Sequence, residues 1–151
     1  MTNPRATARI AGNPIHAMLV PLPIGCFVLT LLSDVVYWMT ASMQWANMSA
    51  WLLTVGLVMA LFAVIAGLVD FLGERRIRRL PEVYIHAIGN GLALLLAIAN
   101  AFIHSRDAYT SVAPTGLTLS ALTVLILAVT NWMGRRLVYR HRVGVRPEAD
   151  Q

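Results

Sequence analysis

Charged side chains are scarce in this sequence of 151 residues: 13% of the residues are charged and 58% are hydrophobic. The mean hydropathy is +0.66. A soluble globule of this size needs far more polar surface than such a composition provides. The balance therefore excludes a soluble domain and predicts that a lipid bilayer is the solvent.

Cysteine is almost absent, since Cys26 is the single one in the chain. This excludes a disulfide within the chain and a metal site built from cysteines. The sequence also lacks a phosphate-binding loop, a nucleophile triad and a catalytic carboxylate pair. Any chemistry must therefore come from the few histidines and acidic residues.

Lysine is missing altogether, so the twelve basic residues are all arginine, and the formal net charge is +5. The arginines are clustered, and no soluble domain with a basic face is present to carry a duplex. The pattern therefore favours lipid head groups and excludes nucleic acid as a partner. Eleven of the twelve lie in three segments: the N-terminal arm, the stretch 74–82 and the stretch from Arg135 onward. By the positive-inside rule, both termini are predicted to be cytoplasmic in an inner membrane.

Four apolar runs are long enough to cross roughly 30 Å of hydrocarbon as helices. No small-residue cleavage site follows the first run, so we interpret it as a retained helix and not a signal peptide. The predicted fold is an all-α integral membrane bundle of four helices, packed up-down-up-down. The expected spans are about 18–38, 50–72, 83–103 and 117–134, within a domain from 14 to 136 that is flanked by a mobile arm (1–13) and a tail (137–151).

Prolines and a repeated tripeptide mark the starts of two of these runs. Pro21 and Pro23 cannot donate to carbonyls one turn earlier, so they predict a late start or a kink in the first helix. The tripeptide Ile-His-Ala occurs at His16 and again at His86, seventy positions later. The end of the second run, DFLG followed by two arginines at Arg75 and Arg76, also resembles NWMG before Arg135 and Arg136. These matches suggest a parallel internal repeat that places His16 and His86 in equivalent positions.

The two entry histidines are candidate axial ligands of a b-type haem. The first and third helices of an up-down bundle are diagonal partners, so His16 and His86 can face each other across its interior. Arginines just outside the membrane are suitable partners for the haem propionates. These are Arg75, Arg76 and Arg136, with Arg78 and Arg135 nearby.

Two alternatives remain open at this level of the membrane. A non-haem iron or zinc ion could be held by His16, Asp70, His86 and His141, because nitrogen and carboxylate ligands suit these metals. Alternatively no cofactor is bound, and a buried His–Asp network only fixes helix packing in a structural or partner-binding subunit. Asp70 is more readily explained as an ion-pair partner of Arg75 or Arg136 than as a ligand.

A second polar group is expected at the opposite membrane face. It contains Asp34, Asn100 and His104. Asp34 follows His16 by 18 residues, about 27 Å of helix, so the two levels cannot form one site. We expect Asp34 to be paired at that interface and His104 to be a solvated loop residue.

Several segments together resemble a family of bacterial membrane proteins, domain of unknown function 2231. They read NPIHAMLVPLPIG, SDVVYW, GLVDF, HAIGN and, most specifically, LVYRH followed by VGV, and the resemblance covers about Gly12 to Val145. It implies a four-span bacterial membrane protein in which certain positions tend to be kept: His16, Asp34, Asp70, His86, Asn90 and His141.

The resemblance also bears on function, because some relatives are joined to redox domains. It thus favours electron transfer, with a redox partner or a second copy of the chain as possible partners. The chain departs from the family pattern at several positions. Asn13-Pro14 stands where relatives often have His-Pro, Ala17 replaces a usual proline, and Arg135, Arg136 and Arg142 stand where Gly, Glu and Gly are common. A ligand site that needs the lost His or Glu would be altered here.

Overall fold

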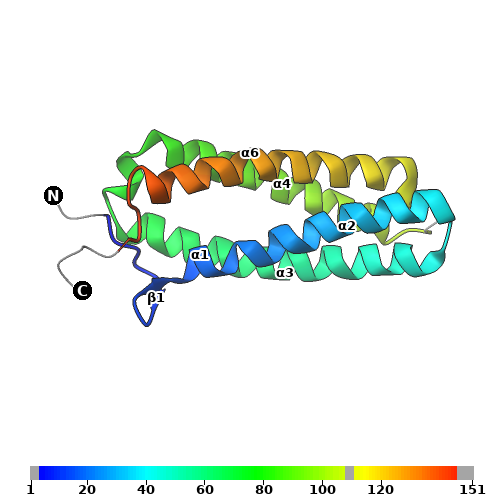
Figure 1. Cartoon of the computed structure of the whole chain (residues 1–151), viewed down its shortest axis with the longest axis horizontal. Coiled ribbons are helices and arrows are strands. Elements are labelled where there is room, and N and C mark those ends of the chain that lie inside the picture. Colours follow the sequence, from blue (N-terminus) through cyan, green and yellow to red (C-terminus); the bar gives the residue numbers. More distant parts are fainter. Residues whose placement is uncertain (1–3, 108–110, 146–151) are drawn as a thin grey trace.

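The computed structural model describes residues 4–107 and 111–145, and this part of the chain forms a bundle of long helices (Figure 1). The long helices are α2 (Pro21–Thr40), α3 (Met43–Gly73), α4 (Pro81–His104) and α6 (Leu117–Tyr139). The shorter elements are β1 (Arg9–Ile10), β2 (Asn13–Pro14), α1 (Ile15–Leu19), the 3-10 turn η1 (Ile77–Arg79) and the π-helical turn η2 (Val112–Gly116).

In the described part of the chain, four stretches of helix are long and apolar enough to cross a membrane: Ile15–Thr40, Met43–Gly73, Pro81–His104 and Val112–Tyr139. Each contains one of the runs expected from the sequence. The shortest has 24 residues, which is about 36 Å at 1.5 Å per residue. The all-α membrane bundle is therefore confirmed.

Two helices are longer than the apolar runs alone indicate. The second span, expected from 50, begins at Met43, so the connection expected at 39–49 shrinks to Ala41 and Ser42. Polar residues such as Gln44 and Asn47 do not prevent helix formation, because no glycine or proline interrupts the chain before Gly56. The fourth helix, expected to end at 134, continues to Tyr139 and includes Arg135, Arg136 and the first three residues of the predicted tail.

The prolines of the first span act as expected. The short helix α1 ends at Leu19, and α2 begins at Pro21 with Val20 between them. Pro21 and Pro23 lack the N–H groups that a continuous helix would need here. Val20 keeps helical φ and ψ of -51° and -40°, so the hydrogen-bond ladder is interrupted here while the backbone stays helical.

The helices form a square in which α2 and α4 occupy diagonal corners. α2 packs mainly on α3, and α4 mainly on α6, while α2–α6 and α3–α4 contacts are less extensive. Figure 1 shows successive long helices running in alternating directions along the bundle. As a result, α1, the end of α3, the start of α4 and the end of α6 share one end. We call this the arginine-rich end, because residues 75–79 and 135–142 lie there.

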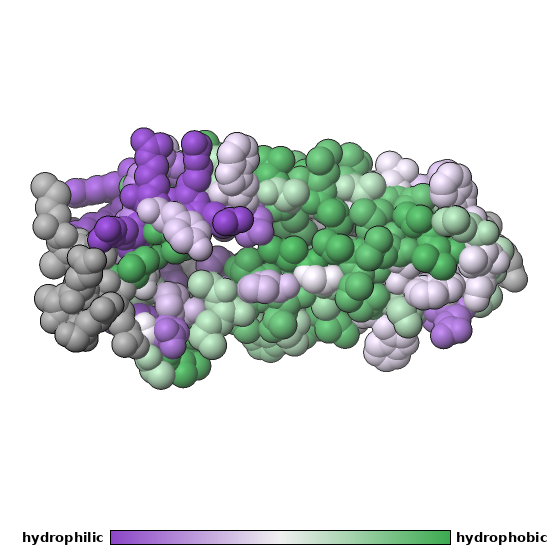
Figure 2. Space-filling model, in the orientation of Figure 1, coloured by the Kyte–Doolittle hydropathy of each residue, from purple (hydrophilic) through white to green (hydrophobic). Residues whose placement is uncertain are grey.

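The distribution of large and small side chains is that of a protein in lipid. The buried core contains Ala60, Ala63, Ala93 and Ala97 together with Phe27, Leu53 and Leu127. Large residues such as Leu61 and Ile65 are about half exposed, at 55% and 51%. Figure 2 shows a hydrophobic band around the middle of the bundle and a strongly hydrophilic arginine-rich end. Small residues inside allow close helix approach, and large residues outside contact acyl chains.

The bundle consists of two similar halves. The pattern of buried, partly buried and exposed positions along 16–32 recurs unchanged along 86–102. The pattern along 49–65 recurs unchanged along 116–132. The pair α1/α2 with α3 is thus related to the pair α4 with α6 by a pseudo-twofold axis that runs along the bundle.

The N-terminal arm makes specific contacts at a few positions, while most of its residues are exposed. Ala6 is 3% exposed, and the Ala8 N–H donates to Asp70 Oδ1 at 2.7 Å. The Gly144 N–H donates to the Pro4 carbonyl at 2.9 Å, so the arm also contacts the tail. The arm and the tail together cover the arginine-rich end of the bundle.

Candidate functional site

The two entry histidines meet inside the bundle. His16 lies on α1 and His86 on the second turn of α4, at diagonal corners of the square. Their ring centroids are 6.3 Å apart, and the ring planes are nearly perpendicular at 83°. The convergence that the repeated tripeptide predicted is therefore present in the structure.

Each imidazole is held by a backbone carbonyl of the neighbouring helix. His16 Nδ1 lies 2.8 Å from the Ala63 oxygen on α3, and His86 Nδ1 lies 3.1 Å from the Thr130 oxygen on α6. A carbonyl oxygen only accepts, so each Nδ1 carries the hydrogen. In the neutral ring the lone pair then lies on Nε2, and in His86 this atom is 3.4 Å from Asn90 Nδ2. Both histidines thus have the tautomer of a metal-ligating imidazole.

Glycines make room for both rings. A Cβ added at Gly67 would lie 2.9 Å from His16 Nδ1, and one added at Gly134 would lie 2.9 Å from His86 Cε1. Each glycine comes four residues after the residue whose carbonyl holds the ring, Ala63 or Thr130. The two halves of the bundle therefore build the same cradle for their histidine.

These cradles correct the register of the internal repeat. The sequence comparison paired Gly73 with Gly134, but in the structure Gly67 occupies the position equivalent to Gly134. Gly73 instead packs against Thr7 of the arm. The equivalence of His16 and His86 is kept, and the helices behind them align six residues earlier on α3 than the sequence indicated.

Asn90 lies one turn after His86 and contacts the same residue. Its Nδ2 donates to the His86 carbonyl at 2.7 Å and lies 3.4 Å from both ring nitrogens. This amide fixes the helix turn that carries the ring. In the other half the equivalent position is Val20, between α1 and α2, so the two cradles differ here.

Asp70 and His141 do not complete a four-ligand metal site. Asp70 Oδ1 accepts the Ala8 N–H, and His141 Nε2 lies 3.2 Å from Glu82 Oε1. Within residues 4–107 and 111–145, no three His, Cys, Asp or Glu side chains are grouped as a metal would require. The expected ion pair of Asp70 with Arg75 or Arg136 is not formed either: this carboxylate is 9% exposed and is bound by the arm.

The arginines proposed as propionate partners lie exposed at the same end as the histidines. The Arg136 guanidinium lies over the Trp132 ring, 5.6 Å from its centroid, and that of Arg135 lies 5.8 Å from the Tyr139 centroid. Arg75 and Arg76 precede η1 in the loop between α3 and α4. Their role as anion partners stays a prediction.

The opposite end holds a polar network that the sequence revealed only in part. His104, expected to be a solvated loop residue, is the last residue of α4 and is 8% exposed. Its Nε2 lies 3.0 Å from Asp34 Oδ1, so the expected partner of Asp34 is this histidine. Ser49 and Ser120 donate to the two carboxylate oxygens. These serines were missed because single hydroxyls in apolar helices carry no sequence signal of their own.

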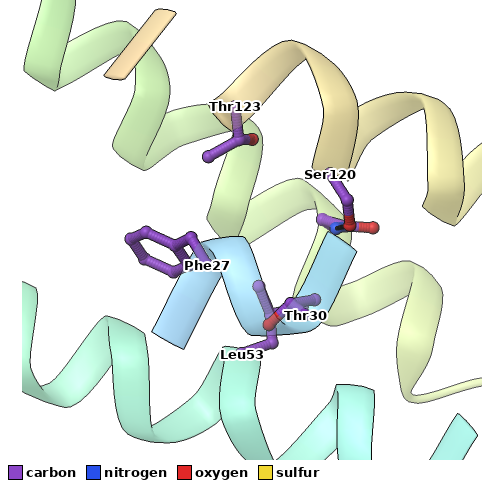
Figure 3. Close-up of a pocket in the computed structure, with 6 residues that line it drawn as sticks. Phe27, Thr30, Leu53, Ser120 and Thr123 are labelled. Carbon is purple, nitrogen blue, oxygen red and sulfur yellow. Dashed lines mark hydrogen bonds between the residues drawn. The ribbon is translucent and has the colours of Figure 1, made fainter. Parts of the chain in front are cut away.

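A small pocket adjoins this network (Figure 3). It is lined by Phe27, Thr30, Leu53, Asn100, Ser120 and Thr123. The pocket has no room for a water molecule. The bundle is therefore closely packed beside the Asp34 network.

The comparison with protein families agrees with this architecture. A family model described as "Predicted membrane protein (DUF2231)" matches residues 12–147. The chain belongs to this family. No curated protein and no solved structure matches it. The family assignment thus supports membrane localisation and contact with the bilayer.

Proposed function

We propose that this family member is a membrane electron carrier in which His16 and His86 are the axial ligands of a b-type haem. The observation that carries the proposal is the meeting of the two imidazoles, 6.3 Å apart, with both Nδ1 atoms bonded to carbonyls. Two metal–imidazole bonds of about 2 Å, with a ring radius on each side, put the centres of opposed rings about 6 Å apart. The observed separation of 6.3 Å is thus close to the one that such a pair would require.

The donor set fits haem better than a bare metal ion. Iron or zinc in a non-haem site needs three or more protein ligands, and only two are present here. A haem brings four equatorial nitrogens of its own and needs only the axial pair. When bound, it supplies one-electron chemistry with both axial positions filled.

The chain's own residues then perform three tasks. The carbonyls of Ala63 and Thr130 orient the rings and raise the basicity of the free Nε2 atoms. Gly67 and Gly134 leave space for the rings beside α3 and α6. Arg75, Arg76 and Arg136 supply positive charge for propionates at the membrane surface.

The orientation proposed for the bundle follows from its arginines. Eleven of the twelve belong to segments at the arginine-rich end or to the tail that follows it, and Arg106 lies beyond the end of α4. We place both termini in the cytoplasm and the protein in a bacterial inner membrane. The histidine pair then lies on the cytoplasmic side, where a redox partner could reach it.

The purified protein tests the cofactor assignment. The expected result is a reduced-minus-oxidised spectrum of a b-type haem, with iron by elemental analysis, that is lost in His16→Ala and in His86→Ala. His141→Ala is the matched control: this histidine lies at the same end but is bonded to Glu82, so the spectrum should persist. A spectrum without a haem band, or one unchanged in both variants, would contradict the assignment.

A structural role is the second candidate, and one observation favours it. Each histidine already links two helices through its hydrogen bond, and ring pairs at this separation occur as ordinary aromatic contacts. In that case both alanine variants lower the unfolding midpoint while neither the wild type nor any variant contains haem. The same preparations thus separate an electron carrier from a cofactor-free subunit.

A further inference from the structure

The Asp34–His104 pair is a second buried titratable site, remote from the histidine pair. Asp34 is 0% exposed, Ser49 0% and Ser120 3%, and together they enclose the carboxylate from α2, α3 and α6. Asp34 follows His16 by 18 residues, about 27 Å along the helix. A carboxylate buried at the end of a membrane bundle is costly, so it needs a specific explanation.

Hydrogen-bond geometry determines how many protons this pair holds. His104 Nδ1 lies 3.0 Å from the Asn100 carbonyl and therefore carries a hydrogen. His104 Nε2 lies 3.0 Å from Asp34 Oδ1, so a second proton must sit between these atoms, on the nitrogen or on the oxygen. Without it, two lone pairs would face each other, and only the Ser49 and Ser120 hydroxyls would stabilise the carboxylate charge. The pair thus holds one exchangeable proton and is neutral overall.

The surrounding hydroxyls can form hydrogen bonds with both the ionised and the protonated form of the Asp34 carboxyl group. Ser120 accepts from Asn100 Nδ2 at 2.8 Å and donates to Asp34 Oδ2 at 2.6 Å, so its hydrogen is committed. Ser49 Oγ lies within reach of both Asp34 Oδ1 and the Thr30 carbonyl, the latter at 3.1 Å. A hydroxyl has one hydrogen, so Ser49 donates to the carboxylate in one state and to Thr30 in the other.

Two further polar atoms near the pair lack partners. Asn100 Oδ1 and Ser111 Oγ are buried without a hydrogen bond in the part of the chain described, and both residues are 1% exposed. Ser111 precedes η2, and a Cβ added at Gly116 would meet both its carbonyl oxygen and the His104 ring. The segment from Ser111 to Gly116 therefore covers the imidazole at the end of the bundle.

We propose that Asp34 and His104 form a proton-binding site, which exchanges one proton with the membrane face opposite the arginine-rich end. The groups that face it are Thr30 from α2, Ser49 from α3, Asn100 from α4 and Ser120 from α6. Arg106 and Asp107 follow His104 on the exposed side. The chemistry is distinct from that of the histidine pair and does not depend on a haem.

Infrared titration of the purified protein in detergent tests this site. The expected result is a carboxylic-acid band that changes with pH, together with the release of one proton per chain. The transition disappears in Asp34→Asn and in His104→Gln. Asp70→Asn is the matched control, since Asp70 is also buried but is bonded to a backbone N–H at the other end. We expect the Asp70→Asn variant to show the same pH-dependent transition as the unmodified protein.

Ser49→Ala tests the same site without removing either titrating group. The acid form of Asp34 does not need the Ser49 hydrogen but the carboxylate does, so this variant displaces the midpoint of the transition. A purely structural pair gives no transition while circular dichroism shows a folded protein, and that result would overturn the proposal. A transition unchanged in Asp34→Asn or Ser49→Ala would do so as well. The haem spectrum is recorded on the same samples, so failure of either assignment is seen separately.

Discussion

Two pairs of equivalent positions account for the chemistry of both ends. His16 and His86 are seventy positions apart, and so are Asp34 and His104. At the arginine-rich end the two halves kept the same residue, which gives two imidazoles able to act as matched ligands. At the opposite end they have an acid and a base, which share one proton. Both ends thus place side chains from equivalent positions of the two halves next to each other. One end pairs a histidine with a histidine, and the other pairs an aspartate with a histidine.

The glycines beside the imidazoles give a prediction at single positions. Gly67→Ala and Gly134→Ala each place a Cβ 2.9 Å from a ring atom, so the ring or the helix must move. Overpacking of this kind costs about 1–3 kcal/mol of unfolding free energy. We expect both variants to unfold earlier in denaturant titrations and to lose the haem band.

Gly91→Ala is the control for these variants. Nothing lies within 4 Å of a Cβ at Gly91, which is exposed on α4. Alanine is favoured over glycine in a helix by up to about 1 kcal/mol, so this change should leave stability equal or higher. Equal losses in all three variants would show that the rings do not require the space.

At the level of helices, the sequence predicted what depends on local composition. The four spans follow from runs of apolar residues, and the interrupted hydrogen bonding between α1 and α2 follows from Pro21 and Pro23. The start of α3 was placed seven residues late, since polar residues at a membrane surface look like a loop. The burial of His104 was missed because its position depends on the fold of α2, α3 and α6. The hydrogen bond from the Ala8 N–H to Asp70 was missed for a similar reason. It involves the N-terminal arm, which has no periodic hydrophobic pattern from which its position could be predicted.

The short connection between α2 and α3 gives a prediction for that element. Ala41 has φ 52°, a left-handed conformation that costs an L-residue about 1–2 kcal/mol and glycine almost nothing. We expect Ala41→Gly to raise the unfolding free energy by up to about 1 kcal/mol. Ala50→Gly, inside α3, should lower it by about the same amount. Denaturant titration in detergent measures both, and a loss in Ala41→Gly would mean that this turn is not formed.

The whole molecule combines a symmetric bundle with an asymmetric charge distribution. Its pseudo-twofold axis runs along the helices, so each polar pair meets on or near that axis, one at each end. The layer between them is built from small and apolar residues such as Leu53, Ala60 and Ala97. No polar continuation joins the two ends among these core residues. We therefore regard the two pairs as separate sites.

The orientation of the molecule gives the last prediction. In a background in which Cys26 is replaced by alanine, single cysteines at Ser42 and Ser105 lie exposed at the end opposite the arginines. They should react with a membrane-impermeant maleimide added to intact cells. A cysteine at Tyr139, which is 77% exposed at the arginine-rich end, should react only after the membrane is opened. The positive-inside distribution of arginine is the physical reason, since arginine-rich segments resist translocation. The reverse labelling pattern would put the histidine pair on the outer side, and the proposed cytoplasmic electron partner would have to be abandoned.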